Sequence, residues 1–226
     1  MIKVLIVETN VQNYQGTTDP TGLWLGESAE FVDEMQRAGI AVDYVSPKGG
    51  FVPLDPRSMK YTDAAIMGIY RDRDFIERGL KNTLAPGTID PTTYSAIYYT
   101  GGHGVMWDFP DNPEIQAIAS AIYAHGGYLL SVCHGIAGLL NLKNTQGDYV
   151  IKGKTITDFT TAEEILAGKK KVVPFLNQDV ATDHGANFQK KRFYKDYTVQ
   201  DGHLITGQNP FSVRSVAQKF ITEVSK

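Results

Sequence analysis

Short apolar runs alternate along this chain with segments in which apolar residues recur every three or four positions. Residues 2–7 and 128–132 are nearly continuous apolar runs, as expected for strands that are buried on both faces of a parallel sheet. Residues 41–45, 96–99 and 203–206 are further predicted strands. Strands that alternate with helices and short turns predict an α/β fold with a mostly parallel sheet.

Three helices are indicated by periodicity together with start and stop residues. The first covers residues 26–38 and stops at Gly39. Asn112 caps the second helix, which has proline at its first position and ends at Gly126. The dipeptide Asn-Pro at 209–210 opens the third, whose apolar residues follow helical spacing to the end of the chain.

Two parts of the chain have a weaker pattern. Residues 51–94 are predicted to be mostly loop, with one helix over residues 71–82. Residues 155–158 are predicted to be a strand. Thr161 and Glu164 have the spacing of a capping box, which predicts that a helix begins there.

Two polar loops follow predicted strands, Gly-Gly-His-Gly at 101–104 and Cys-His-Gly at 133–135. In open parallel sheets, ligands bind outside the carboxyl ends of the strands, so both loops are expected at one site. Cys133 follows an apolar strand and precedes small residues, which is the layout of a nucleophile elbow. The following helix N-terminus predicts a lowered thiol pKa, although a lone cysteine is also commonly an inert core residue.

Two further side chains can assist such a thiol. His134 can act as an acid or a base if an acidic group orients it, or it can be a packed histidine. Glu27 lies where the first helix begins, at the same edge of the predicted sheet. A carboxyl in that pocket would have a raised pKa and could shuttle a proton. The alternative is a glutamate that only complements the helix dipole.

Composition excludes several classes of protein. The 226 residues carry a net charge of −3, so nothing favours nucleic acid as a partner. No apolar run is long enough to cross a bilayer, and the N-terminus lacks the pattern of a secretory signal. A single cysteine excludes an intrachain disulfide, and these features predict a cytoplasmic protein. No pair of histidines has metal-ligand spacing, so no metal is predicted; the other four are His103, His125, His184 and His203.

Five ordered motifs resemble the ThiJ/PfpI superfamily, which has the class I glutamine amidotransferase-like fold. They are Leu-Leu-Ser-Val-Cys-His-Gly at 129–135, the glycine loop at 101–104 followed by Asp-Phe-Pro-Asp, Thr-Gly-Leu-Trp-Leu-Gly-Glu at 21–27, Ser-Pro-Lys-Gly-Gly at 46–50, and Leu-Ile-Thr-Gly-Gln-Asn-Pro at 204–210. They span nearly the whole chain in the right order. The branch that they resemble contains heat-shock chaperones and glyoxalase III enzymes.

The resemblance implies a flavodoxin-like sandwich, with helices on both faces of the sheet, in one domain over residues 1–226, and a homodimer. It implies that Cys133 is the nucleophile, with His134 as its neighbour and Glu27 as the carboxyl at the sulfur. The triad acid of this branch would be Glu164, with Glu163 as the near alternative.

The resemblance also implies an oxyanion pocket and an activity. The amides of Gly102 and His103, with that of His134, would hold the oxyanion. The implied reaction converts methylglyoxal to lactate through a Cys133 hemithioacetal, without glutathione, metal or organic cofactor, in protection against carbonyl stress.

Three alternatives belong to other classes of protein. A glutamine amidotransferase would carry a downstream histidine followed two residues later by glutamate, and neither His184 nor His203 has that pattern. A cysteine peptidase or amidase of the same superfamily would need a substrate cleft. A holding chaperone for unfolded clients, or an oxidative-stress sensor, would need exposed apolar surface or an accessible thiolate. The chaperone, sensor and hydrolase remain open at this stage.

Overall fold

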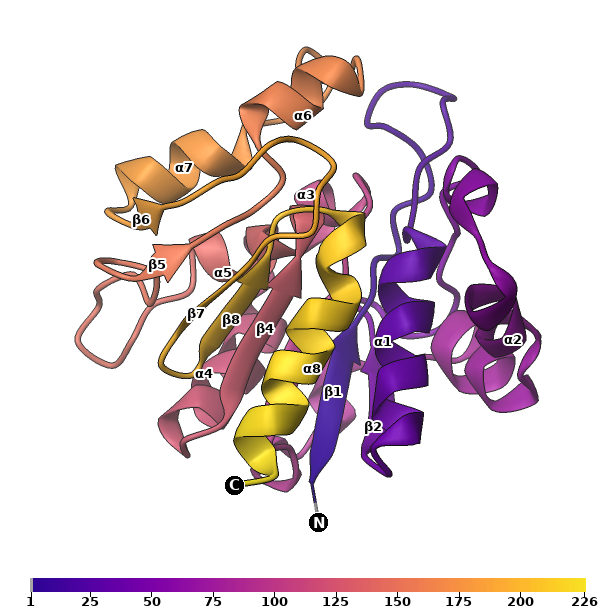
Figure 1. Cartoon of the computed structure of the whole chain (residues 1–226), viewed down its shortest axis with the longest axis horizontal. Coiled ribbons are helices and arrows are strands. Elements are labelled where there is room, and N and C mark those ends of the chain that lie inside the picture. The colour runs from indigo at the N-terminus through magenta and orange to yellow at the C-terminus, as the bar shows by residue number, and fades with distance from the viewer. Residues whose placement is uncertain (1) are drawn as a thin grey trace.

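Six strands form one twisted sheet at the centre of the structure (Figure 1), a computed structural model that describes residues 2–226. The strand order is β2-β1-β3-β4-β8-β7, and only the β7–β8 pair is antiparallel. The mostly parallel α/β fold expected from the sequence is therefore confirmed. The strands are β1 (Lys3–Val7), β2 (Ala41–Val45), β3 (Ala96–Tyr99), β4 (Tyr128–Val132), β7 (Thr198–Asp201) and β8 (Leu204–Gly207).

Helices cover both faces of this sheet because successive strand residues point to opposite sides. Val4 and Ile6 of β1 belong to the core beneath α1 (Leu25–Arg37) and α8 (Val213–Val224). Leu5, in contrast, belongs to a second core on the opposite face. That core is packed by α3 (Val105–Asp108), α4 (Pro113–Ala124) and α5 (Ala137–Leu140). Both faces are thus buried, which is why the central strands β1, β3 and β4 are mostly apolar.

The helix predicted over residues 71–82 is wrong in its bounds. Asp63 accepts a hydrogen bond from the Ile66 N–H and starts α2 (Ala64–Arg71) seven residues earlier. The chain then breaks at Asp72, whose carboxylate accepts the Asp74 N–H. A separate π-helical turn covers Phe75–Lys81. Asp63 and Asp72 thus begin two helical segments where the sequence predicted a single helix over residues 71–82.

Two predictions in the region after β4 also need correction. The strand predicted at 155–158 is only β5 (Thr155–Ile156), which pairs with β6 (Asn187–Phe188) outside the main sheet. The capping box at the start of α6 (Thr161–Leu166) lies one residue earlier than predicted, because Thr160 and Glu163 form it. The neighbouring α7 covers Asn177–Asp183.

Among residues 2–226, none of the helices has the length and apolar character needed to cross a bilayer.

Parallel pairing brings three strand ends to one edge. Val7 of β1 lies beside Tyr99 of β3, and Tyr99 lies beside Ser131 of β4. The segments that follow these strands therefore emerge together at the carboxyl edge of the sheet.

Glu8, the residue after β1, is a fully buried carboxyl at this edge. One of its oxygens accepts a hydrogen bond of 2.6 Å from the Ser28 hydroxyl, and the other has no partner among residues 2–226. Burial raises the pKa of Glu8 from 4.5 to about 8, although the Ser28 hydrogen bond opposes the shift. Ionised Glu8 is thus disfavoured in the folded chain.

We expect Glu8→Gln to weaken the pH dependence of stability. Because the folded pKa lies above the unfolded one, the Glu8 contribution is complete below about pH 4.5 and is lost as the pH rises to about 8. The loss is ~1.4 kcal/mol for each pH unit in that range. Urea unfolding of both proteins at pH 5, 6 and 7 measures the slope. Parallel curves for the two proteins would show that Glu8 ionises freely when folded.

Candidate active site

Cys133 lies in a tight turn at the end of β4. The strand passes directly into a 3-10 turn over Cys133–Ile136, and Cys133 takes a left-handed backbone conformation with φ of 55°. Gly135 permits this turn, because a Cβ atom there would lie 2.2 Å from the Tyr99 carbonyl oxygen. The backbone of the turn is therefore pressed against the end of β3. This is the geometry of the nucleophile elbow that the sequence predicts.

A line of hydrogen bonds runs from the thiol to a carboxylate. The Cys133 Sγ lies 3.2 Å from His134 Nδ1, and His134 Nε2 lies 2.8 Å from Glu164 Oε2. Glu164 comes from α6, and the Phe159 ring packs against His134 with a centroid distance of 4.3 Å. Of the two candidate acids, Glu164 is therefore the one that reaches His134. Glu163 instead accepts hydrogen bonds within its cap.

Glu27 lies beside the sulfur, where α1 begins. Its Oε2 accepts a hydrogen bond of 2.6 Å from the Gly101 N–H. A Cβ atom on Gly101 would lie 2.5 Å from that oxygen and 3.1 Å from the Cβ of Cys133, so only glycine fits between them. Burial raises the pKa of Glu27 from 4.5 to about 8, while hydrogen bonds from Cys133 and Gly101 oppose the shift. Below about pH 8 the Glu27 carboxyl is mainly protonated.

The predicted lowering of the Cys133 pKa is wrong. Burial raises the pKa of this thiol well above its ordinary value, and an ionised Glu27 raises it further. The His134 N–H lowers it, but less than burial raises it. The 3-10 turn and the four-residue α5 that follow do not make one long helix with a strong dipole. The resting cysteine is therefore a thiol beside an imidazole.

A second histidine completes the site, and sequence reasoning missed its side chain. His103 Nε2 lies 2.8 Å from Glu164 Oε1, so two imidazoles share one carboxylate. The Nδ1 of His103 lies 3.5 Å from Nη2 of Arg57, which is itself paired with Asp55. Because Arg57 can only donate, His103 accepts at Nδ1 and donates to Glu164 at Nε2. Its place in the glycine loop was the available signal, whereas Arg57 lay in a segment with no clear pattern.

The two histidines fix the charge states of this cluster. Burial alone would raise the pKa of Glu164, but His134 and His103 hold it well below its ordinary range. Burial and the neighbouring His134 lower the pKa of His103 to about 4, so its ring is neutral at pH 7. Glu164 is thus an ionised acceptor, in contrast to Glu27.

His103 and His134 lie together in the structure, with ring centroids 4.2 Å apart, although no pair of histidines has metal-ligand spacing in the sequence. Their nitrogens and a Glu164 oxygen all lie within 4.8 Å of one another, a ligand set that can hold a metal ion. Residues 103 and 134 come from different loops, so spacing in the sequence could not reveal the set. In the structure each of the two imidazoles is hydrogen-bonded to one oxygen of Glu164.

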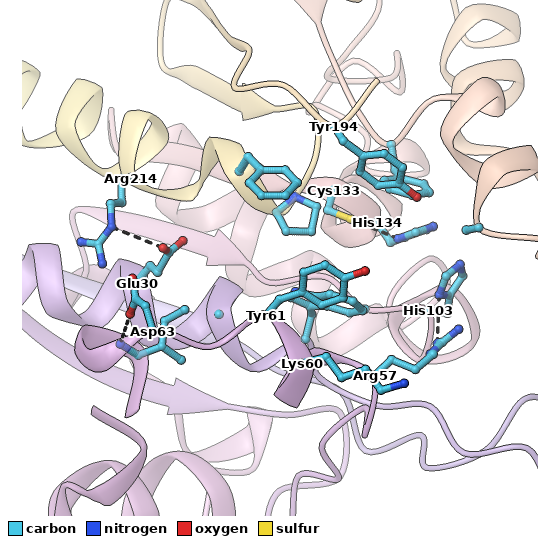
Figure 2. Close-up of a pocket in the computed structure, with 18 of the residues that line it drawn as sticks. Glu30, Arg57, Lys60, Tyr61, Asp63, His103, Cys133, His134, Tyr194 and Arg214 are labelled. Carbon is cyan, nitrogen blue, oxygen red and sulfur yellow. Dashed lines mark hydrogen bonds and ion pairs between the residues drawn. The ribbon is translucent and has the colours of Figure 1, made fainter. Parts of the chain in front are cut away.

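The glycine loop supplies donors at the same place. Within residues 2–226, the N–H groups of Gly102 and His103 have no hydrogen-bond partner. Both residues line a cavity of about 900 Å³ together with Cys133 and His134. Figure 2 shows aromatic residues on its walls and Glu30, Asp63 and Arg214 at the end away from the sulfur. The cavity therefore presents a thiol, an imidazole and free N–H donors to whatever molecule enters it.

Several known proteins are similar to this chain in sequence and in structure. A yeast relative, the glutathione-independent glyoxalase HSP31 of Saccharomyces cerevisiae, is 31% identical, with 97% of this chain and 96% of the relative covered. The crystal structure of glyoxalase III from Candida albicans superposes with a TM-score of 0.85 at 26% identity, covering 98% of this chain and 96% of that one. The structure of Rapid Encystment Protein 24 kDa from Francisella tularensis gives a TM-score of 0.95 at 33% identity, with 99% of each chain covered.

These similarities cover the elements that form the site, from α1, which carries Glu27, to α8, the last helix of the chain. The sequence profile of the DJ-1/PfpI family matches residues 25–223, which include Cys133, His134 and Glu164. With most of its length matched in this way, the chain belongs to the DJ-1/PfpI family.

Proposed function

We propose that this protein is a glutathione-independent glyoxalase that converts methylglyoxal to lactate. The observation that carries the proposal is the hydrogen-bonded line from Cys133 through His134 to Glu164 on the wall of a cavity. Two relatives that match over nearly their whole length support it, one named glutathione-independent glyoxalase HSP31 and the other Glyoxalase 3. Cys133 replaces the thiol of glutathione, because it can itself form a hemithioacetal with the aldehyde.

The first step is addition of sulfur to the aldehyde carbon. His134 accepts the thiol proton through Nδ1, while Glu164 stabilises the imidazolium that forms. The aldehyde oxygen gains charge as the C–S bond forms. The free N–H groups of Gly102 and His103 are the proposed donors to this oxygen, which then takes a proton to give the hemithioacetal.

The second step moves a proton between the two substrate carbons. A base removes the proton from the carbon bonded to sulfur, and an enediol forms. Return of a proton to the neighbouring carbon gives a thioester of lactate. Glu27 or His134 can be this base, and a pKa of about 8 for Glu27 places it close to the working pH of a proton shuttle. Water then adds to the thioester, the Cys133 thiol leaves with a proton, and one methylglyoxal plus one water has become lactic acid.

Holding of unfolded clients is a second candidate function. Four apolar residues at or near the cavity mouth are well exposed; they are Tyr61, Leu166, Phe193 and Phe211. Such a patch can bind unfolded chains.

The homodimer, the single domain and the cytoplasmic location stay predictions from the sequence. Sedimentation tests the homodimer, limited proteolysis tests the single domain, and cell fractionation tests the location.

We expect Cys133→Ala to abolish lactate formation while the fold is kept. The substitution removes only one sulfur atom, and loss of a nucleophile typically lowers turnover ~10⁴-fold or more. The measurement is lactate formed from methylglyoxal without added thiol or metal, together with the thermal unfolding midpoint. Near-native lactate formation by a folded Cys133→Ala protein would exclude the covalent route.

Alkylation of Cys133 by iodoacetamide should be slow at pH 7 and should accelerate with a midpoint above ~8.5, the value for a free thiol. Burial and ionised Glu27 both disfavour the thiolate, so Glu27→Gln should move the midpoint to lower pH. Mass spectrometry at a series of pH values gives the rates. A midpoint near pH 7 in the wild-type protein would show that the helix N-terminus outweighs burial.

Glu27→Gln separates the enzyme from the chaperone. If Glu27 moves the proton between the two carbons, the variant should lose ~10²–10⁴-fold in lactate formation. Thiol addition remains available, so a stalled hemithioacetal is expected by mass spectrometry. Suppression of client aggregation should be unchanged, because holding needs no proton transfer.

The control is Glu114→Gln, which makes the same change in the first turn of α4, on an exposed residue outside the site. It should leave both activities unchanged. Retained catalysis with lost holding in Glu27→Gln would reverse the ranking of the two functions. Loss of both in a folded protein would show that Glu27 is structural.

A further inference from the structure

Two residues other than glycine have a left-handed backbone in residues 2–226. They are Cys133, with φ of 55°, and Tyr194, with φ of 50°. An aromatic residue rarely adopts this conformation, and it persists only where the surroundings fix it. Such positions cluster at functional sites. Tyr194 lines the same cavity as Cys133, so both strained residues face one site.

Glu163 holds the strained backbone of Tyr194. Its Oε1 accepts a hydrogen bond of 2.8 Å from the Tyr194 N–H and further bonds from the amides of Gln208 and Asn209. Asn209 also donates to the carbonyl of Lys195 at 2.9 Å. Glu163 is fully buried, so this network is shielded from water. Hydrogen bonds therefore hold the segment around Tyr194 against α6, the helix that also carries Glu164.

The Tyr194 side chain extends over the reactive groups. Its ring centroid lies 6.1 Å from that of Phe159, which packs on His134, and 6.4 Å from that of Phe211. Figure 2 shows Tyr194 near Cys133 and His134, where it lines the cavity. Tyr194 is 37% exposed at the cavity; its backbone N–H binds Glu163, whereas no residue that the structure describes hydrogen-bonds its hydroxyl. Burial raises the pKa of Tyr194 to about 12, so the hydroxyl stays protonated and can donate.

The proposed reaction needs a donor at a second oxygen. Removal of the proton from the sulfur-bonded carbon places negative charge on the neighbouring ketone oxygen of the enediolate. The Gly102 and His103 amides are proposed to hold the first oxygen, and the His103 ring is already committed to Glu164 and Arg57. The Tyr194 hydroxyl, in contrast, is free.

We propose that the Tyr194 hydroxyl donates a hydrogen bond to the ketone oxygen of the bound 2-oxoaldehyde and stabilises the enediolate. This inference rests on the proposed glyoxalase function. It makes Tyr194 a catalytic residue that acts on the second carbon, whereas Cys133 acts on the first. It also confines efficient substrates to aldehydes with an adjacent carbonyl.

The test is Tyr194→Phe, which keeps the ring and removes only the donor. We expect kcat for methylglyoxal to fall ~10²–10³-fold, as for loss of one oxyanion donor. The KM should stay within threefold, and both the Cys133 alkylation rate and the thermal unfolding midpoint should stay near wild type. A merely structural role would instead change the alkylation rate together with kcat.

Tyr197→Phe is the matched control, because Tyr197 belongs to the same segment but does not line the cavity. It should keep wild-type kcat. A Tyr194→Phe protein with at least half of the wild-type kcat, or one whose alkylation rate falls in parallel with kcat, would overturn the inference and leave the glyoxalase function standing. A wild-type protein that forms no lactate would refute the glyoxalase function itself, and this inference with it.

Discussion

The close approach of the turn after β4 to the end of β3 is the constraint on which the site depends. A Cβ atom at position 135 would lie 2.2 Å from the Tyr99 carbonyl oxygen, so only glycine there permits the sharp turn that follows β4. The turn places Cys133 in its left-handed conformation and sets His134 within 3.2 Å of the sulfur. The same crowding leaves room only for glycine at position 101, whose N–H then binds Glu27. The thiol, the imidazole and the Glu27 carboxyl are thus gathered around one tightly packed turn.

Burial then gives the two carboxyls opposite roles. The Gly101 N–H and the Cys133 thiol donate hydrogen bonds to Glu27. These bonds lower its pKa by less than burial raises it, so the pKa of Glu27 rises to about 8. Glu164 is also buried, but two imidazoles donate to it, and its pKa stays well below the ordinary range. Environments that push the pKa values of two carboxyls apart are a common way to assign an acid and a base at one pH. Here Glu27 can carry a proton at pH 7, and Glu164 can stabilise a positive imidazole.

Local pattern was sufficient for the parts of the fold in which one physical effect dominates. The central strands of the parallel sheet are buried on both faces, and their apolar runs were predicted correctly. The N-cap of α4 was also predicted correctly, because it depends on one hydrogen bond from the Ile115 N–H to the nearby Asn112 side chain. The five ordered motifs together were enough to predict the family. The Cys133 pKa was mispredicted because it depends on burial, which the whole fold decides. The bond between His103 and Glu164 joins residues 61 positions apart, and no local pattern encodes it.

The strained conformation of Tyr194 runs against local preference, and it is explained by the pair Glu163 and Glu164. Consecutive residues on a helix point in different directions. Glu163 therefore faces the segment over the cavity, where it accepts the Tyr194 N–H, while Glu164 faces the two histidines. A shift of α6 would move the partner of His134 and the anchor of Tyr194 together. The start of that helix, fixed by the capping box of Thr160 and Glu163, therefore positions both the His134 partner and the Tyr194 anchor.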